Sequence, residues 1–139
     1  MAQSIFTHLC RERRLEHKYH ADSAATSREE IGNPPDPRTK AVLARHGIDT
    51  VPHRARQMTV DDYTSYDLVI IMDQENLRGV MRITGEDAAG KLRKLLSFCP
   101  GEENADIQDP WYTHDFERCF TDIMRGCEGL LDHTEMAEG

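Results

Sequence analysis

The 139-residue sequence has little positive charge, few aromatic residues and no long apolar run. Lys and Arg number 17 against 25 Asp and Glu, which gives a formal net charge of −8. A surface that binds duplex nucleic acid has to be basic, so this balance argues against a nucleic-acid partner. No stretch approaches the length of a membrane span, and the first residues do not form a signal peptide. We therefore expect a cytoplasmic protein with no membrane partner.

The sequence also lacks the cysteine spacings that bind zinc. Its four cysteines are Cys10, Cys99, Cys119 and Cys127. They form no Cys-x-x-Cys pair and no zinc-binding spacing with histidine. We expect reduced, mostly buried thiols, no metal and no cofactor. The length fits a single domain, residues 1–139, with room for a modest core.

The strongest strand signal is the continuous, β-branched run at residues 68–72. Such a run predicts a parallel strand that is buried on both faces. Residues 19–25 are typical of a second short strand, and residues 91–98 are compatible with either a strand or a helix. Strands that alternate with helices indicate an α/β fold of three layers, with a small parallel sheet flanked by helices.

Apolar spacing and capping residues predict the helices. The segment 1–10 has one apolar face and no capping side chain ahead of it. The last helix has the most regular pattern, with apolar residues recurring from Phe116 to Leu131. Three more helices are expected, from about Arg38 to His46, after a capping box at Thr59, and from Asp73 to about Arg82.

The stretch 109–112 reads Asp-Pro-Trp-Tyr and is the most informative for function. A carboxylic acid held beside aromatic rings can have a raised pKa and donate a proton to a leaving oxygen. Asp109 would be that acid, with Trp111 and Tyr112 as flat apolar walls. Asp109 also fits the first residue of an Asp-Pro turn, which spacing alone favours, and Trp111 and Tyr112 fit core aromatics that close a loop equally well.

A basic stretch, residues 53–57, could orient an anion or, more commonly, pair with acidic side chains. It contains His53 and Arg56. Asp73 directly follows the predicted strand at 68–72, at the edge where open α/β sheets bind ligands. Asp73 could instead form a structural ion pair with the basic stretch.

A nucleophile for phosphate chemistry is hard to find. A phosphate-cleaving thiol needs a loop of backbone N–H groups around the phosphate, completed by an Arg. Only Cys119 and Arg125 have the Cys-x5-Arg spacing, and they lie inside the last predicted helix with no Gly between them. Six residues of helix turn about 600°, so the two side chains point to different faces. We therefore expect Cys119 to be a core residue.

Six short segments occur in an order that is typical of one protein family. They are residues 22–27, 32–38, 45–48, 55–57, 72–73 and 109–112. On these segments the chain resembles the low-molecular-weight protein tyrosine phosphatases nearly from end to end. The resemblance implies a substrate of phosphotyrosine protein or small aryl phosphate, hydrolysed through a cysteinyl-phosphate intermediate.

The resemblance also implies a role for each candidate residue. Asp109 looks like the general acid, which protonates the tyrosyl oxygen and then activates water. Trp111 and Tyr112 look like walls of the aryl pocket. The segment that contains Glu29 lies on the substrate side, where the family usually has an aromatic residue. Four residues look like supports that hold the residues of the site in position: Ser23, His53, Arg56 and Asp73.

One part of the family pattern is missing from this sequence. Family members have a central first strand that runs into a Cys-x5-Arg-Ser-Pro phosphate loop, and Met1 aligns just after that loop. We expect the chain to be inactive as given, through a start site assigned too far downstream or a deliberate shortening rather than a naturally inactive relative. Loss of a central strand leaves two open sheet edges. We expect residues near Tyr19 to pair with 68–72, or a homodimer to close the gap.

Two other functions fit parts of the sequence. A non-catalytic pseudo-phosphatase or interaction module would keep the fold without the phosphate loop. A thiol-linked arsenate reductase shares the fold but needs further cysteines after the strand at 68–72, and residues 74–98 contain none.

Overall fold

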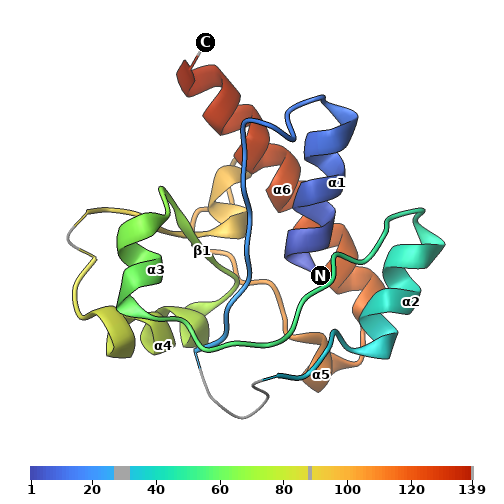
Figure 1. Ribbon diagram of the computed structural model, residues 1–139, viewed down its shortest axis with the longest axis horizontal. Helices are drawn as coiled ribbons and strands as arrows, with labels where there is room; N and C mark the ends of the chain where they lie inside the picture. Colours follow the sequence, from blue (N-terminus) through green and yellow to red (C-terminus); the bar gives the residue numbers. More distant parts are fainter. Residues whose placement is uncertain (27–31, 88, 139) are drawn as a thin grey trace.

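Helices dominate the computed structural model, which describes residues 1–26, 32–87 and 89–138 (Figure 1). In chain order the elements are α1 (Ala2–Glu12), α2 (Pro37–Arg45), α3 (Val60–Ser65), β1 (Val69–Ile71), α4 (Gln74–Thr84), β2 (Leu92–Lys94), the 3-10 helix η1 (Leu95–Phe98), α5 (Pro110–Thr113) and α6 (Phe116–Glu138). The five predicted helices are confirmed as α1, α2, α3, α4 and α6. Within these ranges no helix is long and apolar enough to cross a membrane.

The described strands form a two-stranded parallel sheet, which confirms the α/β class. Val69 pairs with Leu92 and Ile71 with Lys94. The ambiguous segment 91–98 contains both kinds of structure, because β2 runs directly into η1. The crossover between the two strands is α4, as parallel strands require a connection that returns along the sheet.

The side chains of β1 face two apolar clusters. Ile71 is buried with Met58 and Val80, whereas Ile70 packs against the main core on the other side. Val69 and Ile70 remain partly exposed, so the predicted burial on both faces is wrong for them. Pairing with β2 uses the backbone groups of Val69 and Ile71 and turns those of Ile70 to the opposite edge. No strand among the described residues pairs with that edge.

The strand predicted at residues 19–25 is absent. Its last residue, Ala25, forms an isolated parallel bridge with Gln57, and the preceding residues have no assigned strand. The predicted pairing near Tyr19 with residues 68–72 is also wrong, because β1 pairs with β2. Tyr19 is held elsewhere: its ring packs edge-on against Phe6 at 6.0 Å, and its hydroxyl donates to Glu135 of α6. This segment is therefore anchored to α1 and α6 rather than to the sheet.

The main core forms where α6 packs on α1, α2 and η1. All four cysteines are buried and free, as predicted. The predicted apolar positions of α6 do face this core: Cys119, Phe120, Ile123, Cys127, Leu130 and Leu131 are buried, with Phe116 and Met124 partly buried against them. Two glycines let the elements approach closely. A Cβ at Gly126 would lie 2.4 Å from the Leu95 side chain, and one at Gly129 would lie 2.6 Å from the Phe98 carbonyl oxygen.

Candidate functional site

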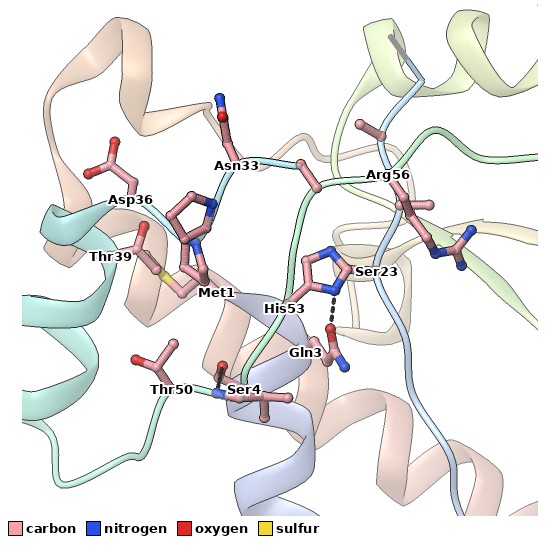
Figure 2. Close-up of a pocket in the computed structure, with 16 residues that line it drawn as sticks. Met1, Gln3, Ser4, Ser23, Asn33, Asp36, Thr39, Thr50, His53 and Arg56 are labelled. Carbon is pink, nitrogen blue, oxygen red and sulfur yellow. Dashed lines mark hydrogen bonds between the residues drawn. The ribbon is translucent and has the colours of Figure 1, made fainter. Parts of the chain in front are cut away.

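A cavity of about 250 Å³ opens where the amino ends of α1 and α2 meet two loops (Figure 2). The first backbone N–H groups of a helix have no partner within it and carry a partial positive charge. No side chain caps α1, so its amino end suits an anion, whereas the Asp36 carboxylate already caps α2. The lining residues are Met1, Gln3, Ser4, Ser23, Ala24, Ala25, Asn33, Pro34, Pro35, Asp36, Thr39, Thr50, Val51, His53, Ala55 and Arg56.

Three of the predicted site residues, Ser23, His53 and Arg56, meet at this cavity. The Ser23 hydroxyl donates a hydrogen bond to the side-chain oxygen of Gln3 on α1 at 2.6 Å. The Nδ1 atom of His53 lies 3.7 Å from Asp22 Oδ1. Residues 22 and 23 thus connect α1 to the loop that carries His53.

Arg56 joins two acidic residues from different parts of the chain. Its guanidinium donates to Asp62 at 2.8 Å and to Asp22 at 2.9 Å. The hydrogen bonds to Asp62 and Asp22 raise the pKa of Arg56, and the same bond from Arg56 lowers the pKa of the Asp62 carboxyl. Arg56 is therefore a partner for acidic side chains, the commoner of the two roles considered for the basic stretch.

Asp73 caps α4 instead of pairing with the basic stretch. Its carboxylate accepts a hydrogen bond from the Asn76 backbone N–H at 2.7 Å, which satisfies one unpaired donor of the helix start. The ion pair considered between Asp73 and residues 53–57 is therefore wrong. The Asn76 side chain in turn accepts from the Met72 N–H at 3.1 Å, so the cap fixes the junction between β1 and α4.

Asp109 caps the short helix α5. Its carboxylate accepts from the Trp111 backbone N–H at 2.9 Å, and Pro110 occupies the first helical position. Trp111 and Tyr112 are 59% and 74% exposed, so the interpretation of these rings as core aromatics is wrong. The turn interpretation of the Asp-Pro pair is confirmed, and it leaves both rings accessible. Neither Asp109 nor Asp73 is among the described residues that line the cavity.

The cysteines are poor nucleophiles in this structure. Burial raises the pKa of Cys119 to about 11 and that of Cys127 to about 12. Burial also raises the pKa values of Cys10 and Cys99. Arg125 is no phosphate ligand for Cys119, because its guanidinium pairs with Glu102 and Asp122. Within the described ranges, no three His, Cys, Asp or Glu side chains are grouped to hold a metal ion.

The low molecular weight phosphotyrosine protein phosphatase family model matches residues 1–138. The chain belongs to this family. It is 38% identical over 136 residues to the low molecular weight phosphotyrosine protein phosphatase of Gallus gallus, with 95% of this chain and 85% of that protein covered. It is 37% identical to the protein-tyrosine-phosphatase YfkJ of Bacillus subtilis, with 94% and 84% covered. The crystal structure of YfkJ superposes with a TM-score of 0.93 at 35% identity, covering 99% of this chain and 87% of YfkJ.

The predicted phosphatase family is thus confirmed across the chain, together with the α/β fold. The structure collects the predicted site residues in two places, the cavity with Ser23, His53 and Arg56, and the α5 turn with Asp109, Trp111 and Tyr112. Glu29, predicted on the substrate side, lies outside the described residues.

The sequence analysis missed several residues that line this cavity. Gln3, Ser4 and Asp36 line the cavity, and Ser4 Oγ accepts from the Val51 backbone N–H at 2.9 Å. Asp36 could have been found, because Asp followed by Pro is a typical helix start. Gln3 and Ser4 had no comparable signal, since their importance comes from contact with residues far along the chain.

Proposed function

We propose that this chain provides the general acid and the supporting loops of a phosphotyrosine-hydrolysing site, and that the 139 residues alone are catalytically inert. Asp109 protonates the tyrosyl oxygen as the phosphorus–oxygen bond breaks, and then takes a proton from the attacking water. Trp111 and Tyr112 flank the aryl ring, and Glu29 stays a predicted substrate-binding residue. Ser23 and His53 support the phosphate loop, and Arg56 and Asp73 hold the surrounding segments in place.

The α5 turn supports the role of Asp109. Its carboxylate is oriented by the Trp111 N–H, yet the residue is exposed and so remains open to solvent and substrate. The neighbouring rings of Trp111 and Tyr112 offer apolar faces that can stack on a phenyl group. A proton donor and an aryl-binding surface therefore lie within one short turn.

The proposal that the chain alone is inert is based on the four thiols. A thiol must be ionised to attack phosphorus, and burial raises the pKa of every cysteine in the chain. None of them is among the described residues that line the cavity. None of the four thiols is accordingly proposed to act as a phosphate nucleophile.

Turnover of p-nitrophenyl phosphate tests this proposal. We expect no release of p-nitrophenol above the background of a mock purification, both for the wild type and for Cys119→Ser. Turnover that disappears in Cys119→Ser would contradict the proposal, because the thiol of α6 would then be the nucleophile. Turnover that is equal in both proteins, and absent from the mock purification, would contradict it as well.

A non-catalytic interaction module remains the second candidate, because Trp111 and Tyr112 stay accessible without a phosphate loop. Titration with O-phosphotyrosine, followed by the fluorescence of the single Trp, distinguishes the two. The inert phosphatase domain proposed above is expected to show no saturable change. Saturable binding without turnover would favour the module. The arsenate reductase alternative has weaker support, since residues 74–98 contain no cysteine.

We also propose that the open edge of β1 pairs with a second copy of the chain. The Ile70 backbone groups point away from β2, and in the described part of the chain no strand meets them. An unpaired strand edge is a template for pairing with another chain. The four free cysteines agree with a cytoplasmic protein.

A further inference from the structure

The α5 turn is weakly attached to the rest of the molecule. Apart from the partly buried Pro110, residues 108–115 are all exposed. The hydrogen bonds described for residues 109–114 are all local. Thr113 N–H donates to Asp109 O at 3.3 Å and His114 N–H to Pro110 O at 2.8 Å, and the one bond that leaves the segment runs from Asp115 N–H to the Thr113 hydroxyl oxygen at 3.2 Å. A turn with so few attachments needs another contact to fix its position.

Arg38 of α2 provides such a contact. Its guanidinium carbon lies 5.3 Å from the centre of the Trp111 ring and 4.8 Å from that of Phe116. Both distances are in the range of a cation–π interaction, which is attractive because an aromatic face carries partial negative charge. Trp111 belongs to α5 and Phe116 begins α6, so one cation contacts the chain on both sides of the loop between these helices. Figure 1 shows α5 next to the amino end of α2.

Asp36 holds the Arg38 guanidinium in place. Its carboxylate accepts from Arg38 Nε at 3.2 Å and from Arg38 Nη2 at 2.9 Å. This bidentate ion pair orients the guanidinium plane. The same carboxylate accepts from the Arg38 backbone N–H at 2.8 Å and so caps α2. Asp36 also lines the cavity, so the pair of residues connects the cavity wall to the α5 turn.

We propose that Arg38 is a positioning residue that clamps the α5 turn against α2 and thereby fixes where Asp109 lies relative to the cavity. The role assigned to Asp109 rests on the proposed function, whereas the clamp itself is a property of the fold. The clamp works because Asp36 pre-orients a planar cation that Trp111 and Phe116 then contact. Lysine in place of Arg38 keeps the charge but cannot form the bidentate ion pair with Asp36, so the Arg38→Lys variant should keep the clamp only in part.

Trp111 is the single tryptophan of the chain, so its fluorescence reports on the turn directly. The experiment compares collisional quenching by acrylamide in the wild type, Arg38→Met, Arg38→Lys and the control Arg45→Met. Arg45 is in the same helix and pairs with Glu117 of α6, and the cation described over the Trp111 ring is Arg38 rather than Arg45. Loss of an exposed cation–π contact lowers the equilibrium constant for docking of the turn by about two- to fivefold. Quenching should therefore rise in Arg38→Met, rise less in Arg38→Lys and stay at the wild-type level in Arg45→Met.

A second variant keeps the test decisive if Arg38→Met fails to fold. Asp36→Asn retains a helix-capping side chain but removes the charge that orients Arg38. We expect increased Trp111 quenching in this variant, together with a shifted NMR signal of the Trp111 amide, which donates to Asp109. Wild-type quenching in both Arg38→Met and Asp36→Asn would overturn the clamp. Because no turnover is measured, this outcome is independent of whether Asp109 is the general acid.

Discussion

Single charged side chains connect segments of this phosphatase that no regular secondary structure joins. Arg56 is the clearest case, because it ties the extended segment at Asp22 to the start of α3 at Asp62. Asp62 has two roles, because its carboxylate pairs with Arg56 and also accepts from the Thr59 N–H at 2.8 Å in the capping box of α3. Its side chain is largely shielded from solvent, so the ion pair is screened less than an ordinary surface pair.

Replacement of Arg56 by Met should destabilise the fold at neutral pH. We expect a loss of about 1 kcal/mol in the free energy of unfolding at pH 7, typical of a partly buried pair. Arg56 lowers the folded-state pKa of Asp62, so the pair stabilises the fold above the unfolded pKa of Asp, about 4, and this contribution is lost as the pH falls through the folded-state pKa. Urea unfolding of the wild type and the variant should therefore differ at pH 7 and converge in acid.

The control for this prediction is Arg82→Met, which removes an exposed cation of α4. It should match the wild type at both pH values. A difference between wild type and Arg56→Met that persists unchanged in strong acid would show that packing, and not the ion pair, is responsible.

At the scale of whole elements, α6 organises the fold. It contacts α1, α2 and η1, and its two glycines allow η1 to approach its backbone. Gly129 is the more restrictive position, because the atom it faces is the Phe98 backbone oxygen rather than a movable side chain. A glycine inside a long helix costs about 1 kcal/mol of helix propensity relative to alanine. Close approach of η1 outweighs that cost here.

Gly129→Ala should consequently lower stability in spite of the better helix propensity of alanine. A Cβ at 2.6 Å from a carbonyl oxygen forces η1 and α6 apart. Overpacking of this kind costs about 1–3 kcal/mol, of which the propensity gain offsets about 1. Glu128→Ala, one residue earlier on the exposed face, is the matched control and should change the urea midpoint little. Equal midpoints for the two variants would refute the close-packing argument.

On the scale of the whole molecule, the short sheet is its least protected part. β1 is covered by apolar side chains on both faces, and no strand pairs with its outer edge in the described residues. The extended segment before Ala25 does not pair with that edge, because Tyr19 holds it against α1 and α6. A second copy of the chain is the partner that we propose for this edge.

Self-association makes stability depend on protein concentration. Because the dimer is favoured by mass action, the midpoint of urea unfolding should rise over about a hundredfold increase in protein concentration. Light scattering after size exclusion should give a mass near twice the 15.9 kDa of the chain. A monomeric mass together with a concentration-independent midpoint would exclude pairing through β1.

Local patterns in the sequence determined the helices, the caps and the family. The apolar repeat of α6, the capping box at Thr59 and the β-branched run at Val69–Ile71 are all confirmed, because each depends on neighbours within a few residues. The Asp-Pro turn at Asp109 is confirmed for the same reason.

Contacts between distant residues decided the rest, and only the tertiary structure contains them. The segment at 19–25 has a strand-like sequence, but Tyr19 packs on Phe6 of α1 and donates to Glu135 of α6 instead of pairing with the sheet. The sequence allowed an ion pair between Asp73 and Arg56, yet in the structure Arg56 pairs with Asp22 and Asp62. The contact of Arg38 with Trp111 joins residues far apart in the chain, and no periodicity reports on such a pair. Local propensity specifies elements, whereas the partners of each side chain depend on how those elements pack.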